Sequence, residues 1–159
     1  VESDAVARNE ARIAHLMSEP PGGKGESWSR VAAELKATMT DNCGIYRDDA
    51  KLRQALSDIK RLQERYQGVR IMDHSRRFNT DLLGALETGH LLTFSEVVVV
   101  SALARTESRG AHFRTDYARR DDEHWLKYTL AHKSADGPVL SYKDVNINWE
   151  KYPPQERKY

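Results

Sequence analysis

Side chains capable of directed polar chemistry are concentrated in one stretch, residues 101–128. The candidate interface residues in it are Arg105, Glu107, Arg109, His112, Arg120, Asp121, Asp122 and Trp125. Because the charge signs alternate, the stretch is not the basic tail that typically binds nucleic acid, and we expect no nucleic-acid partner. Aromatic rings supply buried area and arginines supply directional hydrogen bonds, so the pattern favours a segment held between two protein surfaces.

The spacing within this stretch suggests how its side chains are used. Arg105 and Arg109 are four residues apart at the expected end of a helix, so we expect both to project from one face and to bind carboxylates or carbonyls. Glu107 and His112 are placed to fix a turn at Gly110. The alternative is an exposed charged loop in which Arg105 and Glu107 pair on the surface, where ion pairs contribute little to stability.

The same residue types form no recognisable catalytic, cofactor or metal motif. Asp121 and Asp122 are adjacent, so on an extended chain they point to opposite sides, which does not suit acid–base catalysis between them. No Cys/His spacing supports zinc, no G-x-G-x-x-G follows a strand, and residues 20–27 lack the spacing of a P-loop. We therefore predict no catalytic, no cofactor-binding and no metal-binding residue in this chain.

Length and composition indicate one domain with a modest core. The chain has 159 residues, of which 39% are hydrophobic and 31% charged, and its net charge is +1. No strong attraction to nucleic acid or to anionic membranes follows from that charge. No apolar run approaches the roughly 20 residues that span a bilayer. The sole cysteine, Cys43, is expected to be a small buried residue, and a start at Val1 leads us to expect an excised or processed piece.

Hydrophobic periodicity predicts four helices. A short helix is expected over residues 3–17, followed by a Pro/Gly-rich linker. Longer helices are expected over about 27–41, over 48–67, and from about 80 to 104. Four consecutive valines, residues 97–100, favour a strand by intrinsic preference, but the helical periodicity on both sides favours a helix. That helix would be buried on more than one face, so neighbouring helices or another domain would have to cover the second face.

The predicted fold class is mainly α. It is an antiparallel three-helix up-down-up bundle, spectrin-repeat-like, with a preceding short helix and a long, mostly irregular C-terminal extension containing short strands. The expected parts are an N-terminal helix and Pro/Gly-rich linker over 1–27, the bundle over 28–107, and an extended tail over 108–159. Within the tail, residues 111–124 are expected to be a loop and residues 139–145 a strand.

Several motifs in one order carry a family resemblance. RTESRGAH (105–112) and RRDDEHW (119–125) resemble the C-terminal region of the flavoprotein subunit of succinate dehydrogenase and fumarate reductase. The resemblance extends upstream through NCGIYR (42–47) and SRRFN (75–79), and downstream to YPPQERKY (152–159), which is similar to the family's usual terminus. Aspartate oxidases share the shorter ESRG-x-H core and are less similar over the rest.

Two positions depart from the family's pattern. Ala118 stands where proline is common, and Tyr128 stands where histidine is common. Each departure bears on local loop rigidity and leaves the resemblance in place.

The resemblance implies a function for the parent protein. That protein would oxidise succinate to fumarate on FAD, or run the reverse reaction, and pass electrons to an iron–sulfur subunit and quinone in the electron transport of the tricarboxylic acid cycle. The expected partners of this chain are the flavin domain of the same polypeptide, the iron–sulfur subunit and the membrane anchor subunits. The complex is expected at the cytoplasmic face of the inner membrane, attached through those partners.

The resemblance also implies a limited role for this chain. The flavin domain, the flavin-linked histidine and the substrate-binding residues of the family lie in earlier segments, so this chain alone is expected to be inactive, with no cofactor of its own. Its role would be structural: the candidate residues 105–125 would bind the flavin domain, and the tail would pack on the bundle or on that domain. The alternative is a stand-alone helical module that binds another protein without catalysis.

Overall fold

The computed structural model describes residues 2–147 and 150–152. The expectation for YPPQERKY (152–159) therefore falls, from residue 153 onward, outside the described residues. In chain order the elements are α1 (Glu2–Met17), η1 (Pro21–Gly23), α2 (Trp28–Asn42), β1 (Tyr46–Arg47), α3 (Asp49–Tyr66), α4 (Thr80–Ala104), β2 (Phe113–Arg114), η2 (Thr115–Tyr117), α5 (Asp122–Trp125), β3 (Lys127–Ser134) and β4 (Gly137–Asp144).

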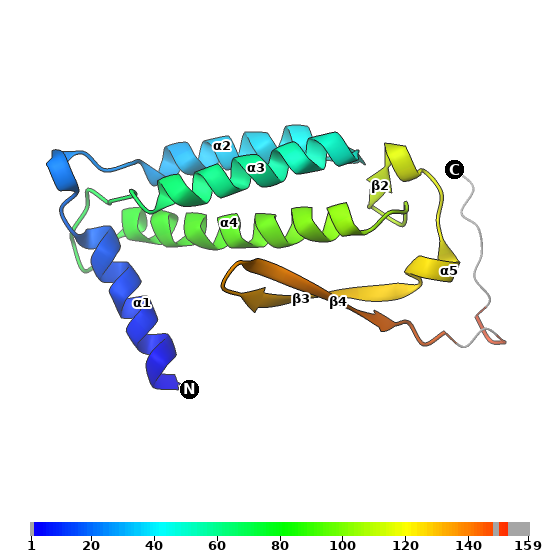
Figure 1. Cartoon of the computed structure of the whole chain (residues 1–159). Helices are drawn as coiled ribbons and strands as arrows, with labels where there is room; N and C mark the ends of the chain where they lie inside the picture. The colour runs from blue at the N-terminus through cyan, green and yellow to red at the C-terminus, as the bar shows by residue number, and fades with distance from the viewer. Residues whose placement is uncertain (1, 148–149, 153–159) are drawn as a thin grey trace.

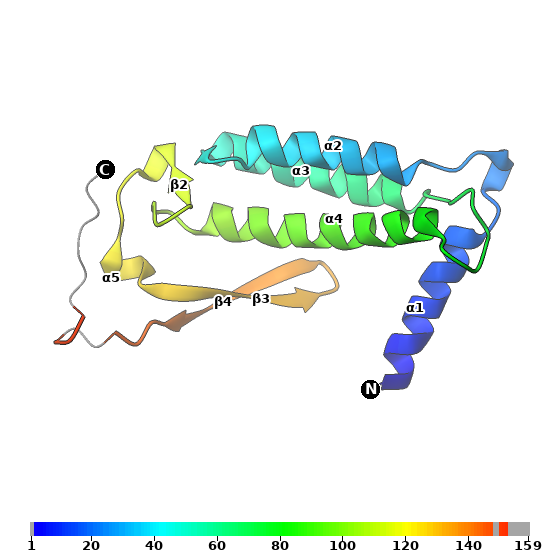
Figure 2. The same cartoon turned by 180° about the vertical axis from the view of Figure 1, so that it is seen from behind.

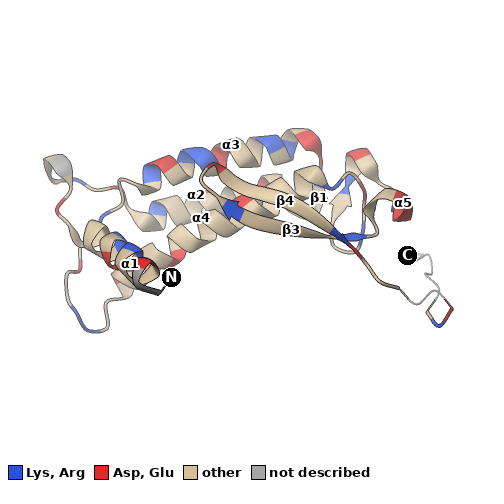
Figure 3. Cartoon of the chain, turned by 60° about the horizontal axis from the view of Figure 1, so that its bottom comes forward, with Lys and Arg blue, Asp and Glu red and all other residues tan. Residues whose placement is uncertain are grey.

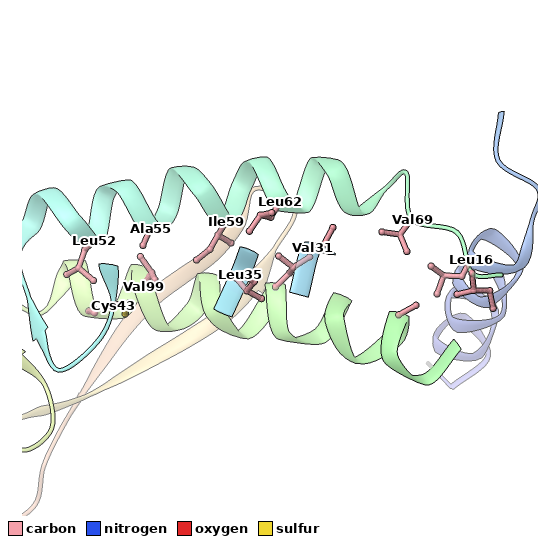
Figure 4. Packing of buried hydrophobic residues seen from close by; sticks show 14 residues of the cluster. Leu16, Val31, Leu35, Cys43, Leu52, Ala55, Ile59, Leu62, Val69 and Val99 are labelled. Carbon is pink, nitrogen blue, oxygen red and sulfur yellow. The ribbon is translucent and has the colours of Figure 1, made fainter. Parts of the chain in front are cut away.

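The predicted three-helix bundle is confirmed: α2, α3 and α4 lie side by side with short connections (Figure 1). Two of the helix starts carry side-chain caps, because Asp48 accepts from the Lys51 amide at 2.8 Å and Asn79 accepts from the Leu82 amide at 2.7 Å. One core joins the helices (Figure 4), and its buried hydrophobic residues are Leu16, Val31, Leu35, Cys43, Leu52, Ala55, Ile59, Leu62, Val69, Ile71, Ala85, Leu92, Val99 and Ala102. Cys43 is buried as expected, and its burial raises the pKa of the thiol.

Helix α4 approaches its neighbours closely. A Cβ at Gly84 would lie 2.5 Å from the Trp28 ring, and one at Gly89 would lie 2.6 Å from the Tyr66 hydroxyl, so glycine lets both aromatic side chains pack on the helix. The Tyr66 hydroxyl donates to the Ala85 carbonyl at 2.7 Å. Residues 97–100 are helical, as the flanking periodicity predicts.

By length and composition, α4 is long and apolar enough to cross a membrane, so the expectation that no run approaches that length was wrong. One such helix is weak evidence for a span. Here α4 packs against α2 and α3, and its buried Glu96 accepts a hydrogen bond from Gln63 of α3 at 2.8 Å. These contacts are those of a bundle helix.

The C-terminal extension is more regular than expected. β3 and β4 pair antiparallel over eight residues each, from Lys127 opposite Asp144 to Ser134 opposite Gly137. The expected strand at 139–145 is therefore part of a longer hairpin. Residues 111–124, expected to be a loop, contain β2, η2 and the start of α5, because β2 pairs in parallel with β1 and polar contacts fix the rest.

Both α1 and the hairpin lie on the α4 side of the bundle, as the views from opposite directions agree (Figure 1 and Figure 2). The hairpin contacts the C-terminal half of α4, and α1 contacts α4 nearer its N-terminal end (Figure 1). The segment between α4 and β3, residues 105–126, joins the bundle to the hairpin.

Candidate functional site

Glu107 is the centre of this connecting segment. Its side chain is 0% exposed and accepts four hydrogen bonds: from Arg105 Nη1 at 2.5 Å, from Arg109 Nε at 2.8 Å and Nη2 at 3.0 Å, and from the Asp121 amide at 2.9 Å. Burial alone would raise the pKa of this carboxyl, but the bonds from Arg109, the Asp121 amide and Arg105 outweigh burial and lower it. A buried carboxylate of this kind is stable because it is paired with charges and fully hydrogen-bonded.

Arg105 ties the end of α4 to the first strand of the hairpin. Besides Glu107, its guanidinium donates to the Trp125 carbonyl at 3.0 Å, the Lys127 carbonyl at 2.6 Å and the Thr129 hydroxyl at 3.1 Å. It also lies 5.1 Å from the centroid of the Trp125 ring. A guanidinium with five donors suits this role, because several acceptors surround it.

Trp125 is itself fixed on the hairpin side. Its Nε1 donates to the Thr106 hydroxyl at 3.0 Å, and its ring meets Tyr142 of β4 edge-on with the centroids 5.6 Å apart. Trp125 therefore links the end of α4 to both strands.

Arg109 extends the network to α5. Its Nη2 donates to Asp122 Oδ1 at 2.7 Å, and Asp122 Oδ2 lies 2.9 Å from Arg120 Nη2. Burial raises the pKa of Asp122, but Arg109 and Arg120 outweigh that effect and lower it. Asp121 uses its side chain differently: it accepts from the amides of Glu123 and His124 at the start of α5. The two adjacent carboxylates have separate partners, so they form no acid–base pair.

His112 closes the turn at Gly110. The backbones of Arg109 and His112 exchange hydrogen bonds of 2.8 and 3.0 Å, and Gly110 between them has a φ of 59°, which glycine adopts readily. His112 Nδ1 accepts from Arg47 Nη1 at 3.2 Å, since a guanidinium can only donate. Nε2–H then donates to the Arg105 carbonyl at 3.1 Å. Burial lowers the pKa of His112, and the nearby positive charges of Arg47, Arg114 and Arg105 add to that effect, so the ring is held neutral.

Arg114 and Asp116 form a second ion pair that the sequence analysis missed. The Arg114 side chain is 1% exposed, and its Nε and Nη2 bind the two carboxylate oxygens of Asp116 at 2.8 and 2.6 Å. Its Nη1 donates to the Ala102 and Leu103 carbonyls at the end of α4, while Asp116 accepts from the Asp49 amide at the start of α3. The pair therefore satisfies the C-terminus of one helix and the N-terminus of the other.

The structure brings the eight candidate residues into one connected region, although for a different reason than the one predicted. Arg105 caps α4 with extended backbone and Arg109 lies beyond the helix, so helical spacing does not align them. Both converge on Glu107 instead. Because Glu107 is fully buried, Arg105 and Glu107 do not form the surface pair of the alternative interpretation. The available signal for the missed pair was the i, i+2 spacing of Arg114 and Asp116.

The arrangement suits structural fixation, because the buried donors and acceptors are bonded to one another. Among residues 2–147 and 150–152, no group of three or more His, Cys, Asp or Glu side chains is placed to hold a metal ion. The described strands form two two-stranded sheets and no strand–helix–strand unit with a glycine-rich turn, so the residues present do not fit a dinucleotide such as FAD. No flavin chemistry is therefore assigned to this chain's residues.

Comparisons with known proteins give consistent matches. A family model described as "Fumarate reductase flavoprotein C-term" matches residues 32–159. The fumarate reductase flavoprotein subunit of Mycobacterium tuberculosis H37Rv is 43% identical over 156 residues, which cover 98% of this chain and 26% of that protein. The succinate dehydrogenase flavoprotein subunit of Coxiella burnetii is 36% identical over 151 residues, covering 93% of this chain and 25% of that protein.

The fold comparison agrees. A solved chain of E. coli quinol fumarate reductase superposes with a TM-score of 0.85 at 40% identity, covering 97% of this chain and 26% of that chain. The chain thus spans about a quarter of the length of the relatives it matches.

Proposed function

Since this chain belongs to the fumarate reductase flavoprotein C-terminal family, we propose that its parent polypeptide interconverts fumarate and succinate on FAD and that this chain is the structural domain of that enzyme. The names of the relatives include both the reductase and the dehydrogenase, which are the two directions of one reaction. The flavin and substrate chemistry would lie in the part of the polypeptide that the relatives have and this chain does not span.

The observation that carries the proposal is the Glu107 network. It lies within RTESRGAH and RRDDEHW, the motifs of the family resemblance, and it connects the end of α4 to α5 and to the hairpin. A buried ion pair contributes little net stability relative to apolar packing, but it specifies geometry well. Fixed geometry is what a domain needs when it must fit another domain of the same enzyme.

We further propose that the outer side of residues 105–125 contacts the flavin domain or the iron–sulfur subunit. Arg120, Glu123 and His124 are exposed there, next to the buried frame. The quinol-fumarate reductase chains that this fold matches belong to enzymes that use a quinol, which supports a complex with an iron–sulfur subunit and membrane anchors. Attachment at the cytoplasmic face of the inner membrane through those subunits is part of the same proposal.

The test is Arg109→Ala in the complete flavoprotein. It removes the bonds to Glu107 and Asp122, so we expect lower flavin per polypeptide, weaker co-purification of the iron–sulfur subunit and slower fumarate reduction. The matched control is Arg53→Ala, which breaks an exposed 2.5 Å pair with Asp49 on α3 and should leave all three measurements unchanged. If Arg109→Ala also leaves all three unchanged, residues 105–125 have no assembly role.

A further inference from the structure

Helix α4 has two apolar faces, and the bundle covers one of them. Its buried residues, Ala85, Leu92 and Val99 among them, face α2 and α3. On the opposite side Leu83, Leu91, Phe94 and Val98 are between 43% and 69% exposed. Their spacings of eight, three and four residues place them in one stripe along the helix. We call these four residues the α4 stripe.

The α4 stripe lies on the helix that both α1 and the hairpin contact. Both elements project from the bundle on the α4 side, and Figure 3 shows α4 as a largely uncharged ribbon beside them. At the hairpin end, Phe94 and Val97 line a groove of about 680 Å³ together with Ala131 and Pro138 near the hairpin turn. Phe94 belongs to both the stripe and the groove, whose lining also includes charged residues such as Lys60, Glu64 and Lys133. Glu87 and His90 interrupt the stripe between Leu83 and Leu91, and His90 contacts Arg12 of α1 at 2.9 Å.

We propose that the α4 stripe is the docking surface for the part of the same polypeptide that precedes Val1. The inference rests on the proposed function, because it takes this chain to be the C-terminal quarter of a longer flavoprotein. The relatives are about four times as long, and the missing length would join the chain at α1. The N-terminus of α1 lies on the α4 side of the bundle (Figure 1).

Tethering favours this occupant over a second copy of the chain. A segment linked directly to α1 is held at high effective concentration beside the stripe, whereas a second copy must bind from solution. A soluble chain seldom exposes a long apolar stripe with no partner, since such surfaces mark interaction sites. The buried polar groups of the Glu107 network, in contrast, are already bonded within the chain. We therefore place an interdomain contact on the stripe in addition to the one proposed for the outer side of residues 105–125.

The experiment is site-specific photo-cross-linking in the complete flavoprotein. Phe94 is replaced by benzoylphenylalanine, which keeps an aromatic side chain at an exposed position and leaves the Glu107 network intact. Ile45, which is 73% exposed on the connection between α2 and β1, carries the same probe as the control. We expect the Phe94 probe to give an intrachain product whose partner peptide precedes Val1, with a yield several-fold above that of the Ile45 probe.

Three results would overturn the inference: no cross-link from Phe94, a cross-link from Phe94 to a second copy or to the iron–sulfur subunit, or equal intrachain yields from Phe94 and Ile45. The proposed function has its own readout, which is FAD content and fumarate reduction of the unmodified flavoprotein. If the unmodified protein holds FAD and turns over while Phe94 fails to cross-link, the docking surface is wrong and the function stands. If the unmodified protein neither holds FAD nor turns over, the function is wrong whatever the probes show.

Discussion

The Glu107 network and the α4 stripe are opposite in chemistry, and each departs from the usual location of its residue types. The network has the densest charge in the chain, yet its central carboxylate is fully buried and bonded within the chain. The stripe belongs to the most apolar helix, yet four of its large side chains face solvent. Charge density in a sequence therefore does not by itself mark a surface, and apolar density does not by itself mark a core.

The physical reason is that the two kinds of group have different requirements. A buried carboxylate needs specific donors at hydrogen-bond distance, so the chain that contains it must also supply them. Arg105, Arg109 and the Asp121 amide meet that requirement for Glu107. Apolar side chains need only contact area, which any neighbouring protein surface can supply. The network is thus complete within this chain, and the stripe is not.

Breaking the network should give the largest loss of stability. Glu107→Gln removes the negative charge between two arginines, so that Arg105 loses its carboxylate partner and Arg109 keeps only Asp122, and we expect a loss of about 3–5 kcal/mol in the free energy of unfolding. Urea unfolding of the 159-residue chain, followed by helical circular dichroism, measures it. The control Arg53→Gln, at an exposed pair, should cost less than about 1 kcal/mol. A cost for Glu107→Gln as small as that of the control would show that the network is not structural.

The second ion pair should give the next largest effect. Arg114→Met leaves Asp116 without its partner and the Ala102 and Leu103 carbonyls without their donor, so we expect a loss of about 2–4 kcal/mol. Arg114→Lys keeps the charge but loses the two-pronged bond, so it should recover only part of that loss. Equal stability of Arg114→Lys and the unchanged chain, again by urea unfolding, would contradict the geometric role of the guanidinium.

Lowering the pH should remove the contribution of Asp116 to the free energy of unfolding within a defined pH range. Its bond to Arg114 lowers the pKa of Asp116 from 3.8 to about 2. A carboxyl whose pKa is lower in the folded state stabilises the fold above its unfolded pKa, and the stabilisation disappears as the pH falls from about 4 to about 2. We expect the stabilisation from the ionised Asp116 carboxylate to be on the order of 1–2 kcal/mol, because the carboxylate is partly exposed and screened. Unfolding experiments between pH 5 and pH 2 should show a shallower pH dependence for Asp116→Asn than for the unchanged chain; parallel curves would exclude the effect.

Much of the helical architecture could be predicted from the sequence, because caps and periodicity are local signals. Asp48 and Asn79 cap helices that begin where those residues predict. The hairpin was underestimated because residues 127–134 carry mostly exposed side chains and little alternation. Its pairing depends on β4 and on Arg105, which contacts Trp125, Lys127 and Thr129 across about twenty residues of sequence. Such contacts leave no periodic signal.

At the site, too, what depends on nearby sequence could be predicted and what depends on distant contacts could not. The eight candidate residues could be chosen from their types, and the structure brings them together. Their geometry could not be predicted, since Arg109 lies outside the helix and Asp116 serves the start of α3, 67 residues away. The helical periodicity around residues 97–100 predicted a helix buried on more than one face; in this chain the stripe is exposed, and its cover by another domain stays a prediction.

The smallest expected effect is the one that separates the two regions most sharply. Phe94 is 69% exposed, so Phe94→Gln in the 159-residue chain should change the free energy of unfolding by less than about 0.5 kcal/mol. Two residues away on the same helix, Leu92 is 2% exposed, and Leu92→Ala should cost about 2–5 kcal/mol. A cost above about 1 kcal/mol for Phe94→Gln would mean that Phe94 packs within this chain and that the stripe is not free. In the complete flavoprotein the same Phe94→Gln change should cost more than in the chain alone, because there it places an amide in a buried contact. The difference between the two proteins measures how much of the stripe another domain covers.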